Sequence, residues 1–86
     1  MGRARRLRPK HLGKKLKQIR GHLELSQVEM AETLSFPTVH PTNISGYERG
    51  LREPPYSVLL KYARLVAIST DILIDDKLDL PKRFNP

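Results

Sequence analysis

Prolines divide this chain into short segments, and the apolar residues within them recur at helical spacing. The clearest case is one helical face, at i, i+4, i+7 and i+11, formed by Leu12, Leu16, Ile19 and Leu23. No stretch alternates strictly between apolar and polar residues, and no Asn-Gly or Asp-Gly pair signals a hairpin. The chain has 86 residues, which is enough for one domain. The pattern therefore predicts a single all-α domain.

Five short helices are predicted from these segments. Their expected spans are about 11–23, 27–34, 42–49, 57–66 and 70–74. Ser26 and Glu29 form a capping box at the start of the second helix. Ser57 is the expected cap of the fourth helix, and Ser69 or Thr70 that of the fifth. Gly50 ends the third helix, because glycine readily adopts the left-handed conformation.

Two features of the first helix lie outside its apolar face. Lys14, Lys15 and Lys17 are off that face. Gly13 and Gly21 weaken the helix by about 1 kcal/mol each if they are interior.

Positive charge is concentrated at the start of the chain. Residues 1–20 hold nine bases and no acid, whereas residues 21–86 hold seven bases and nine acids. Such a segment is typical of a protein that binds a polyanion, with nucleic acid first and an anionic membrane surface second. The segment lacks the Trp, Phe and repeated Leu that insert into a membrane, and a solubilising role is the plain alternative. We expect a flexible basic arm over 1–10, a domain over 11–75 and a C-terminal tail over 76–86.

Several classes of site are not indicated. The chain has no Cys, which excludes disulfides, thiolate zinc sites and cysteine nucleophiles. It contains no GxGxxG, Walker or HExxH motif, its three His residues lack ligand spacing, and its C-terminal Asp residues lack the calcium-loop pattern. We therefore expect no enzyme, no cofactor and no metal site. No apolar run reaches the roughly 18 residues of a membrane helix, and we expect a cytoplasmic, nucleoid-associated protein.

Two short helices joined by a turn, behind a basic arm, are typical of a helix-turn-helix DNA reader. The chain resembles the Cro/repressor-type (XRE) helix-turn-helix family over about residues 12–74. The residues that carry this resemblance are Ser26-Gln27, Met30-Ala31, Leu34, Ile44-Ser45, Tyr47-Glu48-Arg49-Gly50, Arg52-Glu53-Pro54, Leu59-Leu60-Lys61-Tyr62-Ala63, Ile68-Ser69 and Leu73. The resemblance implies five helices, with the third laid in the DNA major groove.

The chain departs from the family pattern in two places. Between Leu34 and Ile44 it has about three residues more than the commonest family spacing. Either the turn is longer, or the third helix starts earlier with Thr38 as its cap. Glu24 and Ala67 stand where family members often have a Gly or Asn that ends a helix.

The third helix is expected to present its outward N-terminal residues to base edges. These residues are Thr42, Asn43, Gly46 and His40. Asn can pair with adenine through two hydrogen bonds, and the Thr methyl can contact a thymine methyl. Gly46 has no side chain, so this position is either blank or allows the helix to approach DNA closely. The alternative role of Asn43 is local capping.

Contacts to the DNA backbone are expected from three places. Ser26 and Gln27 open the second helix, whose free amides suit a phosphate. The remaining candidates in and after the third helix are Ser45, Tyr47, Arg49 and Arg52. The arm adds Arg3, Arg5, Arg6 and Arg8, on phosphates or in a groove.

Glu48 is an acid on a helix expected to face DNA. Its carboxylate would repel phosphate, so we expect it to face inward. The resemblance implies that Arg20 forms an ion pair with it. Removing one partner of a buried pair can cost about 3–5 kcal/mol.

The leading hypothesis is a sequence-specific, double-stranded DNA-binding transcriptional regulator that acts as a homodimer. Its expected self-association surface is Leu73, Ile74, Leu78 and Leu80, unless these residues only cover the core. The alternative is an antitoxin-like or other protein-interaction module that binds a partner through its C-terminal half. A third hypothesis, RNA binding through the arm, is disfavoured because the chain shows no aromatic platform for stacking.

Overall fold

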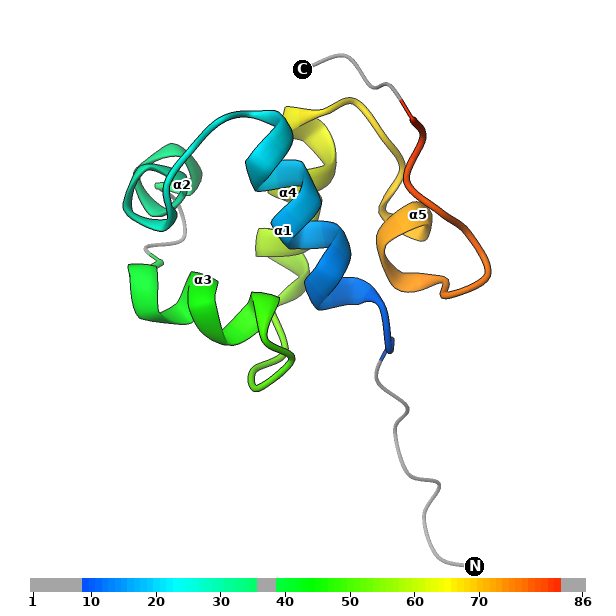
Figure 1. The fold of residues 1–86 in the computed structure, drawn as a ribbon, viewed down its shortest axis with the longest axis horizontal. Coiled ribbons are helices and arrows are strands. Elements are labelled where there is room, and N and C mark those ends of the chain that lie inside the picture. Colours follow the sequence, from blue (N-terminus) through cyan, green and yellow to red (C-terminus); the bar gives the residue numbers. More distant parts are fainter. Residues whose placement is uncertain (1–8, 36–38, 83–86) are drawn as a thin grey trace, which may run out of the picture.

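Five helices and their connections make up the computed structural model, which describes residues 9–35 and 39–82 (Figure 1). The helices are α1 (Leu12–His22), α2 (Gln27–Leu34), α3 (Pro41–Glu48), α4 (Tyr56–Leu65) and α5 (Thr70–Ile74). These residues contain no strand, and the all-α prediction is confirmed. The arm residues Arg3, Arg5, Arg6 and Arg8 lie outside the described residues.

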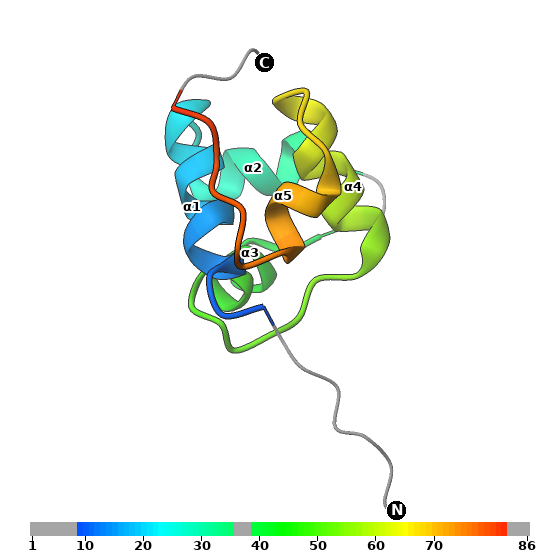
Figure 2. The ribbon, with the colours of Figure 1, turned by 90° about the vertical axis from the view of Figure 1, so that its right-hand side faces the viewer.

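A single core holds the helices together. The predicted apolar face of α1 is buried through Leu12, Leu16 and Ile19. Helix α1 packs against α3 on one side and α5 on another, while α2 packs mainly on α3 (Figures 1 and 2). The largest fully buried side chain is that of Tyr62 in α4. Every helix therefore contributes to the core. Helices this short are only marginally stable alone, so each one depends on packing its apolar face against the others.

Serine side chains cap the starts of two helices, α2 and α5. The Ser26 Oγ accepts a hydrogen bond from the Glu29 amide at 3.0 Å, and the Ser26 amide donates to Glu29 Oε1 at 2.8 Å. The Ser69 Oγ accepts from the Asp71 amide at 3.1 Å at the start of α5. The expected cap Ser57 is wrong, because Pro55 is the N-cap and α4 already begins at Tyr56.

Of the described residues, four at or just after helix ends have a positive φ, and Ser35 at the end of α2, with +38°, is one of them. Gly50, the predicted end of the third helix, has a φ of +74°. Glu24 and Ala67 have φ values of +58° and +56°, although non-glycine residues reach this region at a steric cost. They are the two positions where the family pattern has Gly or Asn, so the chain keeps the backbone conformation without the favourable residue.

The connection between α2 and α3 is a longer turn. Helix α3 begins at Pro41 with His40 as its N-cap, so the earlier start with Thr38 as cap is wrong. Proline suits the first helical position because the amide missing there has no helical partner, whereas deeper in a helix it breaks a hydrogen bond. Thr38 itself lies outside the described residues.

Gly13 permits a close crossing of α1 over the C-terminal end of α3. A Cβ atom at this position would lie 2.6 Å from the Glu48 carbonyl oxygen and 2.7 Å from the Tyr47 carbonyl oxygen. No side chain fits at that distance from backbone atoms. The glycine that weakens the isolated helix is therefore the residue that allows the two helices to pack.

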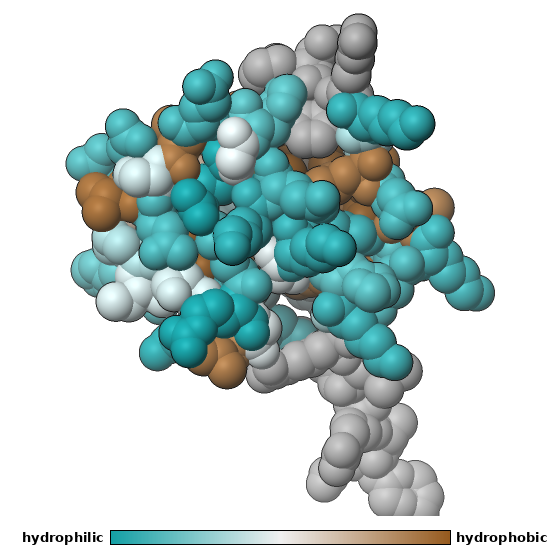
Figure 3. Space-filling model, in the orientation of Figure 1, coloured by the Kyte–Doolittle hydropathy of each residue, from teal (hydrophilic) through white to brown (hydrophobic). Residues whose placement is uncertain are grey.

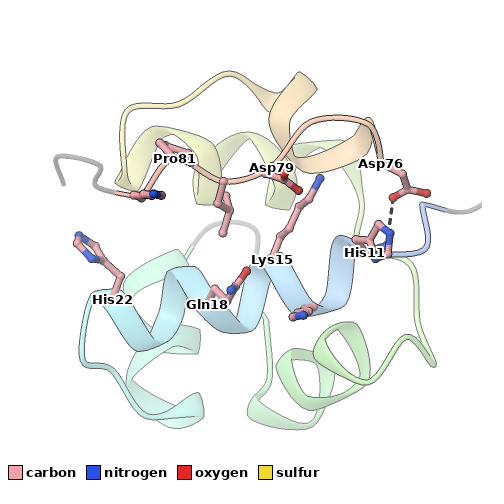
Figure 4. Close-up of a pocket in the computed structure, with 10 residues that line it drawn as sticks. His11, Lys15, Gln18, His22, Asp76, Asp79 and Pro81 are labelled. Carbon is pink, nitrogen blue, oxygen red and sulfur yellow. Dashed lines mark hydrogen bonds between the residues drawn. The ribbon is translucent and has the colours of Figure 1, made fainter.

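Residues 75–82, which we call the C-terminal strap, run alongside α1 (Figures 2 and 4). Asp76 accepts hydrogen bonds from the Lys10 amide at 2.8 Å and from the His11 amide at 3.1 Å. This carboxylate caps the N-terminus of α1, whose own N-cap residue forms no side-chain cap. Leu80 packs against the core. The strap and α1 border a groove of about 680 Å³ lined by both acids and bases.

Lys15 is buried, with 4% of its surface exposed, and does not lie free on the outside of α1 as its place off the apolar face suggested. Its Nζ donates to the carbonyl oxygens of Ile72 (2.7 Å), Asp75 (3.1 Å) and Leu78 (2.7 Å). A cation suits this place because the C-terminal end of a helix, here α5, carries partial negative charge. Lys15 thus ties α1 to the strap that Figure 4 shows above it.

We expect Asp76→Asn to destabilise the protein in a pH-dependent way. The backbone amides of Lys10 and His11 hold the pKa of Asp76 below its ordinary value of 3.8. A carboxyl whose pKa is lower in the folded state stabilises the fold above its unfolded pKa, and this contribution is lost as pH falls through the folded pKa. Urea unfolding across pH 2–7 should show wild type more stable at neutral pH, with the difference closing below pH 3.8.

The matched control for this prediction is Asp79→Asn. It removes the same charge from the same strap, and the Asp79 side chain makes no hydrogen bond to any described residue. Its unfolding curve should stay near wild type. A pH-dependent loss of the same size in both variants would mean that overall charge, not the cap on α1, is responsible.

Candidate nucleic-acid interface

Helix α3 is attached to the core through one side only. Ile44 and Tyr47 are buried on that side. Thr42, which is exposed, lies on the opposite face together with Gly46, because residues four apart share a face of a helix. Arg49, just after the helix, is exposed as well. The outward face of α3 is therefore the one the sequence predicted, although its surface differs in detail.

At the start of α3, Asn43 is engaged within the helix. Its Oδ1 accepts a hydrogen bond from the His40 amide at 3.1 Å. This is the local capping role considered as the alternative for this residue. Pairing with adenine uses both the oxygen and the nitrogen of the amide. The oxygen can accept two hydrogen bonds, so the bond to His40 orients the amide and leaves one acceptor position and the nitrogen for a base. The His40 side chain is exposed beside it.

Gly46 is buried, although it lies on the outward face. A Cβ atom at this position would lie 3.0 Å from Cδ and 3.1 Å from Cγ of Arg52. The aliphatic part of the Arg52 side chain therefore covers the glycine. The expectation that Gly46 is exposed toward DNA, or allows the helix backbone to approach DNA, is wrong for this reason.

Glu48 faces inward and is bound to Arg20. Arg20 Nε donates to Glu48 Oε2 at 2.6 Å and Arg20 Nη2 donates to Oε1 at 3.0 Å. The Glu48 side chain is only 4% exposed and that of Arg20 is 17% exposed. The hydrogen bond to Glu48 raises the pKa of Arg20 above its ordinary value. The structure thus brings together the two residues that the family resemblance pairs.

The same carboxylate connects α3 to the start of α2. The Gln27 Nε2 donates to Glu48 Oε1 at 3.3 Å, and Arg20 Nη1 donates to the Leu25 carbonyl at 2.9 Å. Three elements, α1, α3 and the segment that opens α2, are therefore joined by one network. Gln27 was expected to contact phosphate, and here its amide nitrogen is engaged with Glu48. Ser26 remains exposed.

The other expected phosphate contacts differ in accessibility. Tyr47 is buried, and burial raises the pKa of its hydroxyl. Ser45 is half-buried, while Arg49 and Arg52 are exposed. Tyr62 lies nearby with its hydroxyl fully enclosed and without a hydrogen-bond partner among residues 9–35 and 39–82, and burial raises its pKa as well. Tyr47 and Tyr62 thus pack the underside of α3.

The basic arm joins the domain beside the loop that follows α3. Pro9, the first described residue, lines a small hollow of about 40 Å³ together with Gly50, Arg52 and Pro54. The sequence did not indicate this proximity, because Pro9 and Pro54 lie far apart in the chain. It places the root of the arm next to Arg52, in the loop that follows α3.

The expected self-association surface is only partly exposed. Leu73 is fully buried and Leu80 is half-buried against the core, so these two residues cover the core, which is the alternative that the sequence left open. Ile74 and Leu78 are 40% and 41% exposed. Figure 3 shows hydrophilic residues across the centre of one face, over α1, with hydrophobic residues at its margins.

The described part of the chain contains neither a metal-binding cluster nor a helix that could span a membrane. No group of three or more His, Asp or Glu side chains there is arranged to hold a metal ion. None of the helices in that part has both the length and the apolar character needed to cross a membrane.

Comparisons with known proteins point in one direction. The model of a helix-turn-helix domain family matches residues 13–78. The HTH-type transcriptional regulator ImmR of Bacillus subtilis (strain 168) is 41% identical over 63 residues, which are 73% of this chain and 47% of that protein. The chain thus spans about half the length of this curated relative.

Two solved structures share the fold. One is the P22 c2 repressor protein in complex with a synthetic operator, with a TM-score of 0.65 and 25% identity over 76% of this chain and 94% of that chain. The other is a complex of the SinR and SinI proteins, with a TM-score of 0.66 and 30% identity over 77% of this chain and 62% of that chain.

Proposed function

This chain belongs to the helix-turn-helix domain family, of the Cro/repressor type, and from that premise we propose that it is a transcriptional regulator that binds double-stranded DNA at specific sequences. The observation that carries the proposal is that α3 packs on the core with one side and exposes the other. Ile44, Tyr47 and the Arg20–Glu48 pair hold one side of the helix, and the opposite face, with Thr42, is turned outward. A helix held in this way can enter the major groove as a rigid unit.

The polar and positively charged residues near α3 and in the arm support the same proposal. We propose that Thr42, Asn43 and His40 contact base edges, and that Ser26, Gln27, Ser45 and Arg49 contact the DNA backbone. The arm would add Arg3, Arg5, Arg6 and Arg8, and its root at Pro9 lies beside the end of α3. We propose that the protein is a DNA-binding protein and not an enzyme. We further propose that it is cytoplasmic and associated with the nucleoid.

Selection from a pool of random duplexes tests this function. We expect one enriched motif for the wild type. Thr42→Ala and Asn43→Ala should each change the preference at one or two positions of that motif, by about 1–3 kcal/mol per affected base. The physical reason is that each removes a group able to contact a base edge.

Deletion of residues 1–8 is the contrasting variant. It removes four arginines and should weaken binding to all sequences alike. Each phosphate contact contributes about 0.9 to the slope of log K against log salt, so the slope should fall by roughly 3–4. An unchanged motif in both α3 variants would show that another element reads the DNA.

We also propose that the protein binds as a homodimer, which the motif would report as two inverted half-sites about one helical turn apart. A second candidate function is the binding of a protein partner through the C-terminal half. Exposed Ile74 and Leu78 favour it, and the SinR protein is found in a complex with the SinI protein. If no duplex motif is enriched, the binding of a protein partner becomes the favoured function.

A further inference from the structure

One position on the outward face of α3 is occupied by a side chain from outside the helix. Gly46 lies one turn after Thr42 and has no side chain of its own. Arg52 fills the space, because its Cδ, Cγ and Cβ atoms lie 3.0, 3.1 and 3.4 Å from the place of a Cβ at Gly46. The glycine is buried as a result, while Arg52 itself is exposed.

The backbone fixes this arrangement. The amides of Leu51 and Arg52 both donate to the Gly46 carbonyl oxygen, at 2.9 and 3.2 Å. Gly50, with its φ of +74°, turns the chain back toward α3. The Cα of Arg52 is therefore held against the helix by main-chain bonds. Only the outer part of a long side chain is left to adjust to a ligand.

We propose that Arg52 is a base-reading residue, which replaces the missing side chain of position 46 and contacts a guanine beside the position read by Thr42. This inference rests on the proposed DNA-binding function. The planar guanidinium can donate two parallel hydrogen bonds to O6 and N7 of guanine in the major groove. The Gly46 surface supports its aliphatic part, and this support holds the group over the helix rather than in solvent.

The proposal differs in a measurable way from a phosphate contact. A phosphate contact lowers affinity for every sequence when it is removed, because phosphates carry no sequence information. A guanine contact changes the preference at one position of the motif. Arg49 provides the matched control, since it is also an exposed arginine at the end of α3 but does not lie over Gly46.

Selection from random duplexes with Arg52→Ala, Arg52→Lys and Arg49→Ala tests the proposal. The wild-type motif should contain a G·C pair next to the position that responds to Thr42→Ala. Arg52→Ala should reduce the preference for that pair by roughly tenfold or more. Arg52→Lys should reduce it in part, because an ammonium group cannot reproduce the planar fork. Arg49→Ala should leave the motif unchanged and weaken all sequences.

Gly46→Ala provides a second, independent test. The three atoms nearest to the added methyl group all belong to the flexible Arg52 side chain. The protein should therefore remain at least as stable as wild type, given the higher helix propensity of alanine. The substitution should nevertheless weaken the same G·C preference, because it displaces Arg52 from its position on α3. Unfolding curves measured alongside the selection confirm that the variant is folded.

The outcomes are distinct. If the wild type enriches no motif, the proposed function fails and this inference fails with it. If the wild type enriches a motif, but Arg52→Ala weakens all sequences equally as Arg49→Ala does, Arg52 is a phosphate contact and the inference alone is overturned. Loss of one G·C preference in both Arg52→Ala and Gly46→Ala, but not in Arg49→Ala, supports it.

Discussion

Replacing Glu48 by alanine is expected to lower the free energy of unfolding by about 3–5 kcal/mol. The carboxylate is 4% exposed and accepts hydrogen bonds from Arg20 and Gln27. Its removal leaves a guanidinium that is only 17% exposed without its anionic partner. The cost of an uncompensated, largely buried charge is what makes the effect large. Chemical unfolding at neutral pH measures it.

Two further variants separate the ion pair from general effects of mutation. Glu32→Ala, an exposed acid on α2, should change stability by no more than about 0.5 kcal/mol. The double change Arg20→Met with Glu48→Leu should cost less than Glu48→Ala alone, because no charge is left unpaired. A loss below about 1 kcal/mol for Glu48→Ala would mean that the pair behaves as an exposed surface pair does.

Gly13→Ala should destabilise the protein by about 2–3 kcal/mol, although alanine is the better helix former by about 1 kcal/mol. The new Cβ would lie 2.6 and 2.7 Å from two backbone oxygens of α3. Backbone atoms in a packed helix cannot move aside as a flexible side chain does. Helix α1 must therefore shift away from α3, which disturbs the packing of both. Urea unfolding gives the size of the loss.

Gly21 in the same helix is the matched control. Apart from its chain neighbours and the adjacent backbone of α1, nothing lies within 4 Å of a Cβ built at this position. Gly21→Ala should therefore stabilise the protein by about 0.5–1 kcal/mol through helix propensity alone. The same substitution at two positions of one helix should thus change the free energy of unfolding in opposite directions. Equal effects at both positions would show that the crossing of α1 and α3 is looser than these distances imply.

Much of the fold could be predicted because its signals act over a few residues. Ser26 and Glu29 are three positions apart and cap α2 as expected. Gly50 has the left-handed conformation expected of a residue that ends α3. The failure at Ser57 is instructive, since a serine near a helix start need not be the cap when Pro55 already defines the boundary.

The candidate site was predicted less completely. Thr42 is exposed on the outward face and Glu48 is paired with Arg20, as expected. Gly46 was expected to be open and is covered, because Arg52 folds back over it from the following loop. Helical periodicity gives the direction in which a residue points, but not which other side chain lies on top of it.

The sequence by itself determined that the fold is all-α, the approximate spans of its helices, which of their faces are apolar, and that positive charge precedes the domain. These properties depend on capping, proline and periodicity, which operate within one or two turns. Only the tertiary structure decided that Lys15 binds Leu78, 63 residues away, and that Asp76 caps α1 from 66 residues beyond Lys10. Such contacts depend on how the packed helices bring segments that are distant in sequence close together in space. A pattern that spans only a few residues does not encode which distant segments meet.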